Sequence, residues 1–164
     1  MKKSLFMLGL IISSTLLTKI GIAAQYFEFS NALSNKCLEV GGSKNSNGAN
    51  VNIWECDGGK AQQWELKNIV KDYYVIINRH SGKALEVGGS KKNNGANVNI
   101  WEYDGGRAQQ WELKHISGDY YALINVLSGK ALEVGGSKNS NGANVNIWAY
   151  DGGQAQQWRR IAVN

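Results

Sequence analysis

A carboxylate, an amide and an indole recur together three times along the chain, in the same order and at the same spacing. In the first copy they are Glu39, Asn52 and Trp54. An ionised carboxylate accepts strong hydrogen bonds, an amide donates and accepts them, and an indole offers a flat apolar surface. Such a set predicts a shallow polar binding site with one aromatic wall. The full set is Glu39, Asn52, Trp54, Glu86, Asn99, Trp101, Glu133, Asn146 and Trp148.

The repetition itself argues against an active site. Glycoside hydrolysis, the reaction that paired carboxylates suggest, needs two carboxyl groups in different environments across one bond. Here each carboxylate has near-identical counterparts, and no unpaired set of Ser, His and Asp stands out. We therefore expect a protein that binds its ligand and is not an enzyme.

The three copies belong to a longer repeat with a period of 47 residues. The segments that align without a gap are 38–64, 85–111 and 132–158. A period of this size indicates one supersecondary unit that is used three times. The chain has the length of one domain, which we expect over 25–164. The expected repeats are about 26–72, 73–119 and 120–164.

Each repeat contains short alternating runs bounded by Gly and Asn, a pattern typical of short strands and tight turns. In the first repeat the expected strands are Tyr26–Asn31, Lys36–Val40, Asn50–Glu55 and Gln62–Lys67. Four strands in each of three units predict an all-β fold. Three equivalent units that close around an axis favour a β-trefoil over a propeller, which needs more blades.

Strand alternation predicts which side chains face outward, because successive residues of a strand point to opposite faces. Val51 and Ile53 therefore share one face of the third expected strand. Asn52 and Trp54 lie on the other, and Glu39 in the second strand is predicted to face outward in the same way. An exposed tryptophan is unusual without a use. The alternative is that each indole packs against the next loop, but the convergence of three groups favours a site.

A second tryptophan closes each copy within the motif Gln-Gln-Trp. These residues, Trp64, Trp111 and Trp158, have apolar neighbours of the same parity, and we expect them in the core. The first glutamine of the motif should then be partly buried and must find hydrogen-bond partners. We expect it to satisfy backbone groups or to orient a neighbouring carboxylate. These glutamines are Gln62, Gln109 and Gln156.

Residues 1–24 have the layout of a secretory signal peptide, with Lys2 and Lys3, an apolar run and small residues before Gln25. We predict export, with cleavage after Ala23 or Ala24. No membrane span is expected, because the apolar run is shorter than the ~20 residues that a spanning helix needs. This segment holds three of the 18 basic residues and no acidic one, so the 13 acidic residues nearly balance the remaining charge. That balance gives little support for nucleic-acid binding.

Both cysteines, Cys37 and Cys56, lie in the first repeat. Two cysteines in an exported protein predict a disulfide. The later repeats hold an alanine and a tyrosine at these positions, and a small residue paired with a large one indicates that the positions touch. Zinc is the alternative, but neither His80 nor His115 is repeated and the spacing is wrong. We expect no metal and no cofactor.

The threefold Gln-x-Trp motif, together with the repeated carboxylate and indole, resembles the ricin-B-type lectins, which are β-trefoil carbohydrate-binding modules. The resemblance covers essentially the whole expected mature chain. It implies that the glutamates accept bonds from sugar hydroxyls, that the exposed tryptophans stack on the sugar, and that Cys37 pairs with Cys56. The carbohydrate-binding set that it implies is Glu39, Asn52, Trp54, Gln62, Glu86, Asn99, Trp101, Gln109, Glu133, Asn146, Trp148 and Gln156.

The chain departs from the family pattern at two positions in every repeat. The family carboxylate is usually Asp, whereas this chain has the longer Glu. The residue before the Gln-x-Trp glutamine is often Asn, whereas this chain has Ala61, Ala108 and Ala155. The resemblance therefore does not extend to the galactose specificity that is common among relatives. Asp57 and its counterparts, Asp104 and Asp151, either replace the missing contact or shape the following turn, and turn chemistry is the interpretation we favour.

The sequence therefore predicts a secreted lectin with up to three equivalent sites, each weak alone but strong together on a surface that carries many glycans. One alternative is an accessory carbohydrate-binding subunit associated with a toxin or glycoside hydrolase chain. Another is a trefoil protein-interaction or inhibitor module. The near-identical copies count against this last alternative, because an inhibitor acts through one distinctive loop.

Overall fold

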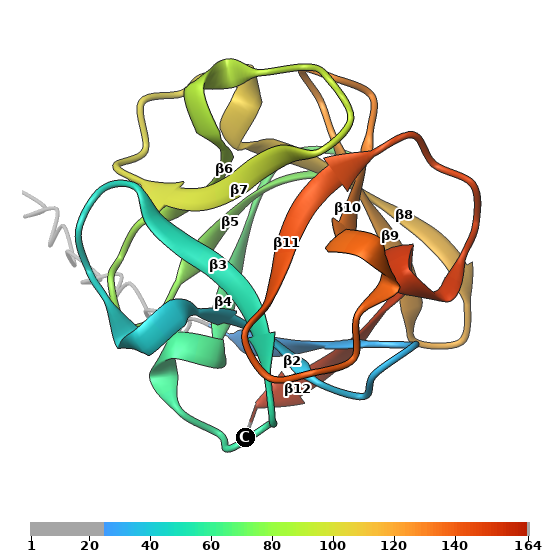
Figure 1. Cartoon of the computed structure of the whole chain (residues 1–164). Coiled ribbons are helices and arrows are strands. Elements are labelled where there is room, and N and C mark those ends of the chain that lie inside the picture. Colours follow the sequence, from blue (N-terminus) through green and yellow to red (C-terminus); the bar gives the residue numbers. More distant parts are fainter. Residues whose placement is uncertain (1–24, 164) are drawn as a thin grey trace, which may run out of the picture.

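The computed structural model describes residues 25–163 as twelve short strands joined by turns (Figure 1). The predicted leader at 1–24 lies outside the described residues. The strands are β1 (Tyr26–Asn31), β2 (Cys37–Val40), β3 (Ala49–Trp54), β4 (Trp64–Val70), β5 (Tyr73–Asn78), β6 (Ala84–Val87), β7 (Ala96–Trp101), β8 (Gln110–Ser117), β9 (Tyr120–Asn125), β10 (Ala131–Val134), β11 (Ala143–Trp148) and β12 (Trp158–Val163). The helical segments are 3₁₀ turns: η1 (Gly41–Ser43), η2 (Lys60–Gln62), η3 (Gly88–Ser90), η4 (Arg107–Gln109), η5 (Gly135–Ser137) and η6 (Gln154–Gln156). Over 25–163, no helix has the length and apolar character needed to cross a membrane.

The first and last strands of each repeat close into a barrel. In order around the barrel, β1 pairs with β4, β4 with β5, β5 with β8, β8 with β9, β9 with β12, and β12 with β1. All these pairs are antiparallel. Closure leaves no unpaired sheet edge in the barrel, which removes the usual route to edge-to-edge aggregation.

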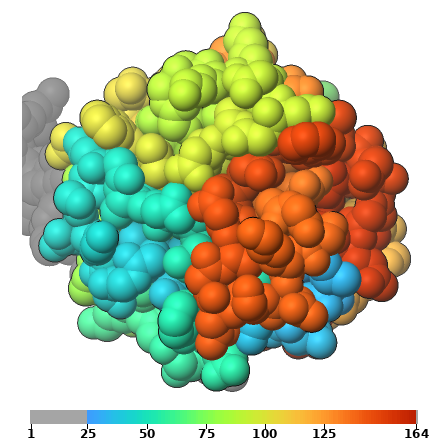
Figure 2. Space-filling view, in the orientation of Figure 1, coloured from blue at the N-terminus to red at the C-terminus, as the bar shows by residue number. Residues whose placement is uncertain are grey.

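The two middle strands of each repeat form a hairpin, and the three hairpins cover one end of the barrel. They contact one another around a central axis through β3–β7, β7–β11 and β3–β11 pairing. Figure 2 shows them as blue-green, yellow-green and orange-red sectors that meet at the centre of this face. A six-stranded barrel capped by three hairpins is a β-trefoil, so the predicted fold is confirmed.

A ring of three asparagines joins the hairpins at the axis. The side-chain amide of Asn50 donates to Asn144, that of Asn144 donates to Asn97, and that of Asn97 donates to Asn50, each at 2.9 Å. An amide carries both a donor and an acceptor, so three of them can close such a cycle. The ring holds equivalent points of the three repeats together.

The predicted core tryptophans are fully buried. Trp64, Trp111 and Trp158 all have zero exposed surface and share one apolar cluster with the inward residues of the hairpins. Each indole N–H donates to the backbone carbonyl of a leucine in the second strand of its own repeat, at 2.9–3.0 Å. These bonds fasten each hairpin to the barrel beneath it.

The strand predicted at Gln62–Lys67 is wrong at its beginning. Residues 60–62 form η2, and β4 begins at Trp64. The backbone N–H of Gln62 donates to the carbonyl of Gly59 at 2.9 Å, which closes a 3₁₀ turn in place of an extended strand. Gln62 therefore does not lie in the same strand as Trp64. The two strands expected before it differ from β2 and β3 by a single residue at their ends.

Cys37 and Cys56 form the predicted disulfide, with their Cα atoms 5.1 Å apart. Cys37 is completely buried at the start of β2. The bond ties β2 to the segment that follows β3, at the edge of the first repeat.

The later repeats suggest how the disulfide can be replaced. We expect the double variant Cys37→Ala with Cys56→Tyr, which copies Ala131 and Tyr150, to retain more stability than Cys37→Ser with Cys56→Ser. Both double variants lose the cross-link, which is worth about 3 kcal/mol for a loop of this length. The serine variant also buries a hydroxyl group at the completely buried position of Cys37. Urea denaturation of the three proteins measures the difference. Equal midpoints for the two double variants would show that the alanine–tyrosine pair does not substitute for the bond.

Candidate functional site

Each hairpin brings one carboxylate, one amide and one exposed indole together. In the first repeat, Glu39 of β2 lies directly opposite Asn52 of β3, and Trp54 is the last residue of β3. The same register recurs in the other hairpins. We call these groups site 1 (Glu39, Asn52, Trp54), site 2 (Glu86, Asn99, Trp101) and site 3 (Glu133, Asn146, Trp148). The three tryptophans are 41–43% exposed, which confirms that they face outward.

The exposed indole also rests against a loop from a different repeat. A Cβ added at Gly142, in the third repeat, would lie 3.7 Å from Cζ3 of Trp54. Gly48 stands in the same relation to Trp101 and Gly95 to Trp148, at 3.6 and 3.7 Å. One edge of the indole is therefore covered and the rest is open. The interpretation that each indole packs against a loop is confirmed, and the lining of a binding site by its open part stays a prediction.

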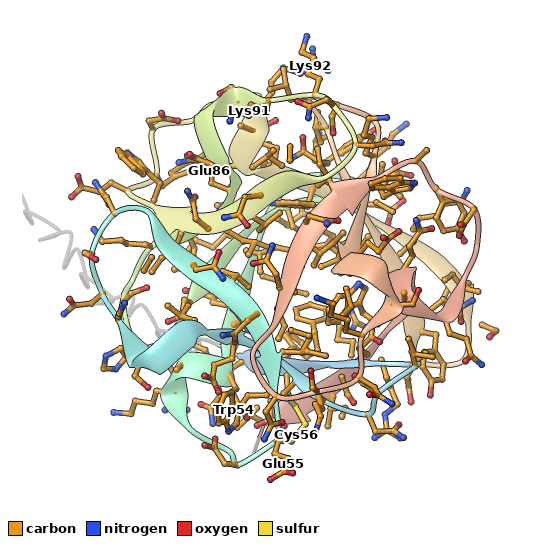
Figure 3. All side chains as sticks on the ribbon, in the orientation of Figure 1. Trp54, Glu55, Cys56, Glu86, Lys91 and Lys92 are labelled. Atoms are coloured by element: carbon orange, nitrogen blue, oxygen red, sulfur yellow. A yellow bond between two sulfur atoms is a disulfide. The ribbon has the colours of Figure 1, made fainter. Side chains whose placement is uncertain are left out.

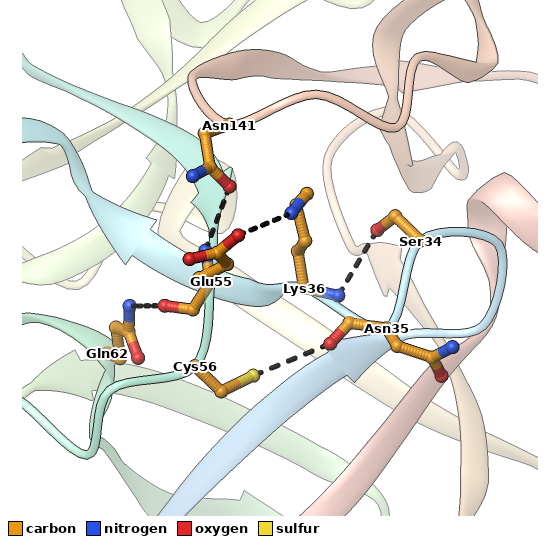
Figure 4. Close-up of polar contacts among 7 residues, drawn as sticks. All are labelled: Ser34, Asn35, Lys36, Glu55, Cys56, Gln62 and Asn141. Atoms are coloured by element: carbon orange, nitrogen blue, oxygen red, sulfur yellow. Dashed lines mark hydrogen bonds and ion pairs between the residues drawn. The ribbon is translucent and has the colours of Figure 1, made fainter.

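Hydrogen bonds fix that loop in place. The side-chain oxygen of Asn141 accepts from the backbone N–H of Glu55 at 3.1 Å (Figure 4). The N–H of Gly142 donates to the carbonyl of Ile53 at 2.8 Å. Asn47 and Asn94 accept in the same way from Glu102 and Ala149, at 3.0 Å. Figure 1 shows each hairpin loop reaching the end of the inner strand of the next hairpin, which is β7, β11 or β3. Every site is thus built from two repeats.

The sequence analysis did not predict this contact between a loop of one repeat and the tryptophan of another. Each Asn-Gly pair was identified as a turn, which it is, since Gly48, Gly95 and Gly142 have φ near +80°. Its contact with another repeat depends on the closure of three units around an axis. The signal available in the sequence was the strict recurrence of asparagine before each of these glycines.

The buried glutamine of the Gln-Gln-Trp motif orients the site carboxylate. The side-chain amide of Gln62 donates to Oε2 of Glu39 and to the carbonyl of Glu55, both at 2.8 Å, and its oxygen accepts from the N–H of Asp57 at 2.9 Å. Gln109 and Gln156 make the equivalent bonds. Gln62 has no exposed surface and both of its N–H donors are used. The expectation that it orients a carboxylate is confirmed.

The site glutamates are less exposed than the alternation argument predicted. Glu39 is only 9% exposed, and its two counterparts are partly buried. Burial raises the pKa of all three above the usual value for glutamate, the bond from the glutamine opposes this rise, and the neighbouring aspartate adds to it. The second face of β2 is covered because the Asp57 turn and η2 fold back over it. The carboxylate is thus a recessed acceptor, not a surface charge.

The asparagine opposite each glutamate has an unpaired oxygen. Oδ1 of Asn52, Asn99 and Asn146 is buried and has no hydrogen-bond partner within 25–163. Leaving a buried acceptor unpaired costs about 1–3 kcal/mol. The same unpaired acceptor is present in all three repeats, and an unsatisfied buried group in a folded protein calls for an explanation.

The aspartates shape the turns after the exposed tryptophans. Oδ1 of Asp57 accepts from the N–H of Gly59 at 2.7 Å, and Asp104 and Asp151 repeat this bond. The turn interpretation is therefore confirmed. The charge of Asp57 still contributes to the negative field around Glu39.

The sites lack counter-charges and metal clusters in the part of the chain that the structure describes. The ion pairs found there join Lys36 to Glu55 and Lys67 to Glu65, and neither includes a site carboxylate. Residues 25–163 contain no group of three or more His, Cys, Asp or Glu side chains that could hold a metal ion. What the site offers is therefore hydrogen bonding to a polar ligand beside an aromatic surface.

Comparison with known proteins agrees with this geometry. The family model described as the ricin-type β-trefoil lectin domain matches residues 25–158. The fold is similar to ThreeFoil, a designed threefold-symmetric protein, with a TM-score of 0.83 and 42% identity over 84% of this chain and 99% of that one. No curated protein sequence matches the chain.

Two larger proteins contain a similar domain. An exo-β-1,3-galactanase from Clostridium thermocellum has a TM-score of 0.83 and 29% identity over 88% of this chain, but this chain covers only 31% of the galactanase. The hemolytic lectin CEL-III has a TM-score of 0.67 and 31% identity over 82% of this chain and 29% of its own length. With the family model matching most of its length, the chain belongs to the ricin-type β-trefoil lectins, a family of carbohydrate-binding domains.

Proposed function

We propose that the mature chain is an exported lectin that binds saccharides through three sites, one for each hairpin, and catalyses no reaction on them. The observation that carries this proposal is the same recessed carboxylate, unpaired amide oxygen and exposed indole at three places around the axis. A mixed polar and aromatic surface suits a pyranose, which has hydroxyls at its rim and C–H groups on its faces.

Each residue has a distinct part in the proposed binding. The exposed face of Trp54 covers the C–H face of the sugar ring. Glu39 accepts a charge-assisted hydrogen bond from a hydroxyl, which is stronger than a bond between neutral groups. Gln62 holds one carboxylate oxygen at 2.8 Å, so the carboxylate is already oriented when the sugar arrives and loses little freedom on binding. Oδ1 of Asn52 supplies a further acceptor beside it.

The arrangement of the sites favours multivalent binding. In Figure 3, Trp54 of site 1 and Glu86 of site 2 lie in separate sectors near the periphery of the molecule. Ligands on one surface or one polymer can therefore occupy more than one site, and the overall avidity then exceeds the affinity of any single site.

A second candidate is an accessory role beside a catalytic or toxin chain. It is supported by the similar domains in the galactanase and in CEL-III, where this chain matches about a third of each protein or less. In that role the three sites hold a partner chain close to a polysaccharide or a glycosylated surface.

A glycan array probed with residues 25–164 tests the proposal. We expect binding to a restricted group of saccharides, together with agglutination of particles that carry them and competition by the free sugar. No binding to any saccharide by a protein that is folded by circular dichroism would refute the function. Release of reducing ends from a bound glycan would refute the absence of catalysis.

A further inference from the structure

The third repeat places a charged residue where the other two repeats place an inward-facing leucine. Two residues after each buried tryptophan, the chain has Leu66 in β4, Leu113 in β8 and Arg160 in β12. Each of them lies directly opposite a fully buried residue of the neighbouring barrel strand, and these partners are Ile76, Leu123 and Phe29. Cross-strand partners share a face of the sheet, so Arg160 points into the same layer of the barrel as the two leucines.

Aromatic rings from the two neighbouring strands hold the guanidinium group of Arg160. Its central carbon lies 5.2 Å from the ring centroid of Phe27 in β1 and 4.7 Å from that of Tyr121 in β9. In the barrel, β12 pairs with both of these strands. The contacts are attractive, because the negative face of an aromatic ring attracts a cation. Neither contact is a hydrogen bond, so neither uses the N–H donors of the guanidinium.

The guanidinium donors have no acceptor in the part of the chain that the structure describes. The arginine side chains that donate hydrogen bonds there are those of Arg79 and Arg107, and the cations in ion pairs are Lys36 and Lys67. Arg160 is partly buried, and a buried charge without a partner is costly. A leucine fills this layer of the barrel without that cost in the other two repeats. The arginine is therefore a candidate binding group and not a requirement of the fold.

Two hollows of the surface meet at Arg160. The charged residues that line the larger hollow, of about 700 Å³, are Asp119, Arg159 and Arg160. The charged or titratable residues that line the smaller hollow, of about 450 Å³, are Asp72, Glu112, Lys114, His115 and Arg160. The larger hollow therefore has fewer carboxylates near Arg160, and it also contains Phe27. Alternation turns Arg159 toward the other face of β12, so Arg160 alone brings an inward positive charge to this hollow.

We propose that the larger hollow binds a small organic monocarboxylate through Arg160. A guanidinium presents its N–H groups as a planar fork, which matches the two oxygens of a carboxylate and forms two parallel charge-assisted hydrogen bonds. Asp119 lines the same hollow, and its backbone carbonyl accepts from the N–H of Arg160 at 2.9 Å. Its negative charge opposes a doubly charged phosphate more than a singly charged carboxylate. The hollow shares no residue with sites 1 to 3, so this inference does not depend on the proposed lectin function.

Nuclear magnetic resonance titration of the protein with isotope-labelled arginine measures this binding directly. The probes are benzoate and glucuronate, with benzamide and glucose as their neutral counterparts, and inorganic phosphate at slightly alkaline pH, where it is mostly a dianion. We expect a carboxylate to shift the side-chain signals of Arg160, and its neutral counterpart to bind about tenfold more weakly, because it lacks the charge-assisted bonds. Phosphate should bind more weakly than the carboxylate. The ratio of benzoate to glucuronate affinity shows whether the body of the ligand is apolar or a sugar.

Substitutions at and around Arg160 separate binding from folding. Arg160→Leu copies Leu66 and Leu113, so it should fold with a urea midpoint at least as high as that of the parent and should lose the carboxylate. Arg160→Lys keeps the charge but not the planar fork, and should weaken binding about tenfold. Asp119→Asn removes an opposing charge and should tighten binding about two- to threefold at low salt. Arg159→Gln is the matched control on the other face of β12, and should change the affinity by less than about twofold.

Several outcomes would overturn the inference while leaving the lectin function intact. One is that neither carboxylate shifts the Arg160 signals at millimolar concentrations, and another is that the Arg160→Leu variant binds the carboxylate as tightly as the parent. Tighter binding of phosphate than of either carboxylate would overturn the ligand class. A variant with alanine at Trp54, Trp101 and Trp148 keeps the hollow and should keep carboxylate binding. Loss of that binding in the folded variant would assign the carboxylate to sites 1 to 3 in place of the hollow.

Discussion

Replacing Trp54, Trp101 and Trp148 together by alanine should abolish saccharide binding while leaving the protein folded. Each indole is 41–43% exposed, so a sugar can cover roughly 100 Å² of it, worth about 2–3 kcal/mol per site at ~25 cal/mol per Å². The core depends on the other three tryptophans, which are fully buried. Titration calorimetry with the best saccharide from an array, and circular dichroism of the variant, measure the two effects.

Single substitutions and a buried control refine this result. Alanine at Trp54 alone should lower agglutination more than it lowers the affinity of the remaining sites, because avidity depends on the number of sites. Alanine at Trp64 should instead destabilise the fold by about 3–5 kcal/mol, because it empties a buried position. Binding as tight as the parent's by the folded triple variant would show that these indoles are not the stacking surface.

Changing Glu39, Glu86 and Glu133 to glutamine should weaken binding by roughly 1–3 kcal/mol per site, the range for losing a hydrogen bond to a charged group. The same change should leave folding stability at neutral pH unchanged or raise it. Burial raises the pKa of these glutamates, so the folded protein carries their charge at a cost. A glutamine oxygen still accepts from Gln62 and carries no charge. Calorimetry and urea denaturation at pH 7 measure the two effects, and unchanged affinity would mean that the carboxylates take no part in binding.

The pH dependence supplies the control for this prediction. Because the pKa is higher in the folded state than in the unfolded chain, the folded state binds more protons between the two values, and stability falls as the pH rises through that window. Sugar affinity changes in the opposite direction: it falls as the pH drops through the raised pKa and the carboxylates become protonated. The parent should therefore lose affinity at a higher pH than an ordinary glutamate would dictate, and the glutamine variant should show neither trend. Aspartate at the three positions keeps the charge but withdraws it from Gln62 by one methylene, and should also weaken binding.

Much of the fold was predictable because the three repeats have the same local pattern of residues. Alternation in β3 correctly placed Trp54 outward and Ile53 in the core. The apolar neighbours of Trp64 correctly placed it inside, and the substitution of the cysteine pair by alanine and tyrosine correctly indicated contact. These inferences succeed because strand parity and burial are properties of a few adjacent residues.

The details of the site were less predictable because side-chain hydrogen bonds override alternation. Gln62 was expected in a strand, but it ends a 3₁₀ turn. Its side-chain amide forms hydrogen bonds with Glu39, Glu55 and Asp57. Glu39 was expected on the surface, but that turn covers it. A buried amide must satisfy its donors, and the partners that do so lie up to 23 residues away in the chain.

The sequence by itself determined the three hairpins, their inward and outward faces and the residue types of each site. Only the tertiary structure decided which repeats share a site. The loop that follows β6 belongs to the second repeat, yet Asn94 and Gly95 dock against the third, beside Trp148. Periodicity along one chain cannot show this, because neighbouring repeats have the same sequence and any of them would provide the same partner. Closure of the three hairpins around the axis selects one neighbour, and thereby places Gly95 against Trp148 and not against Trp101 of its own repeat.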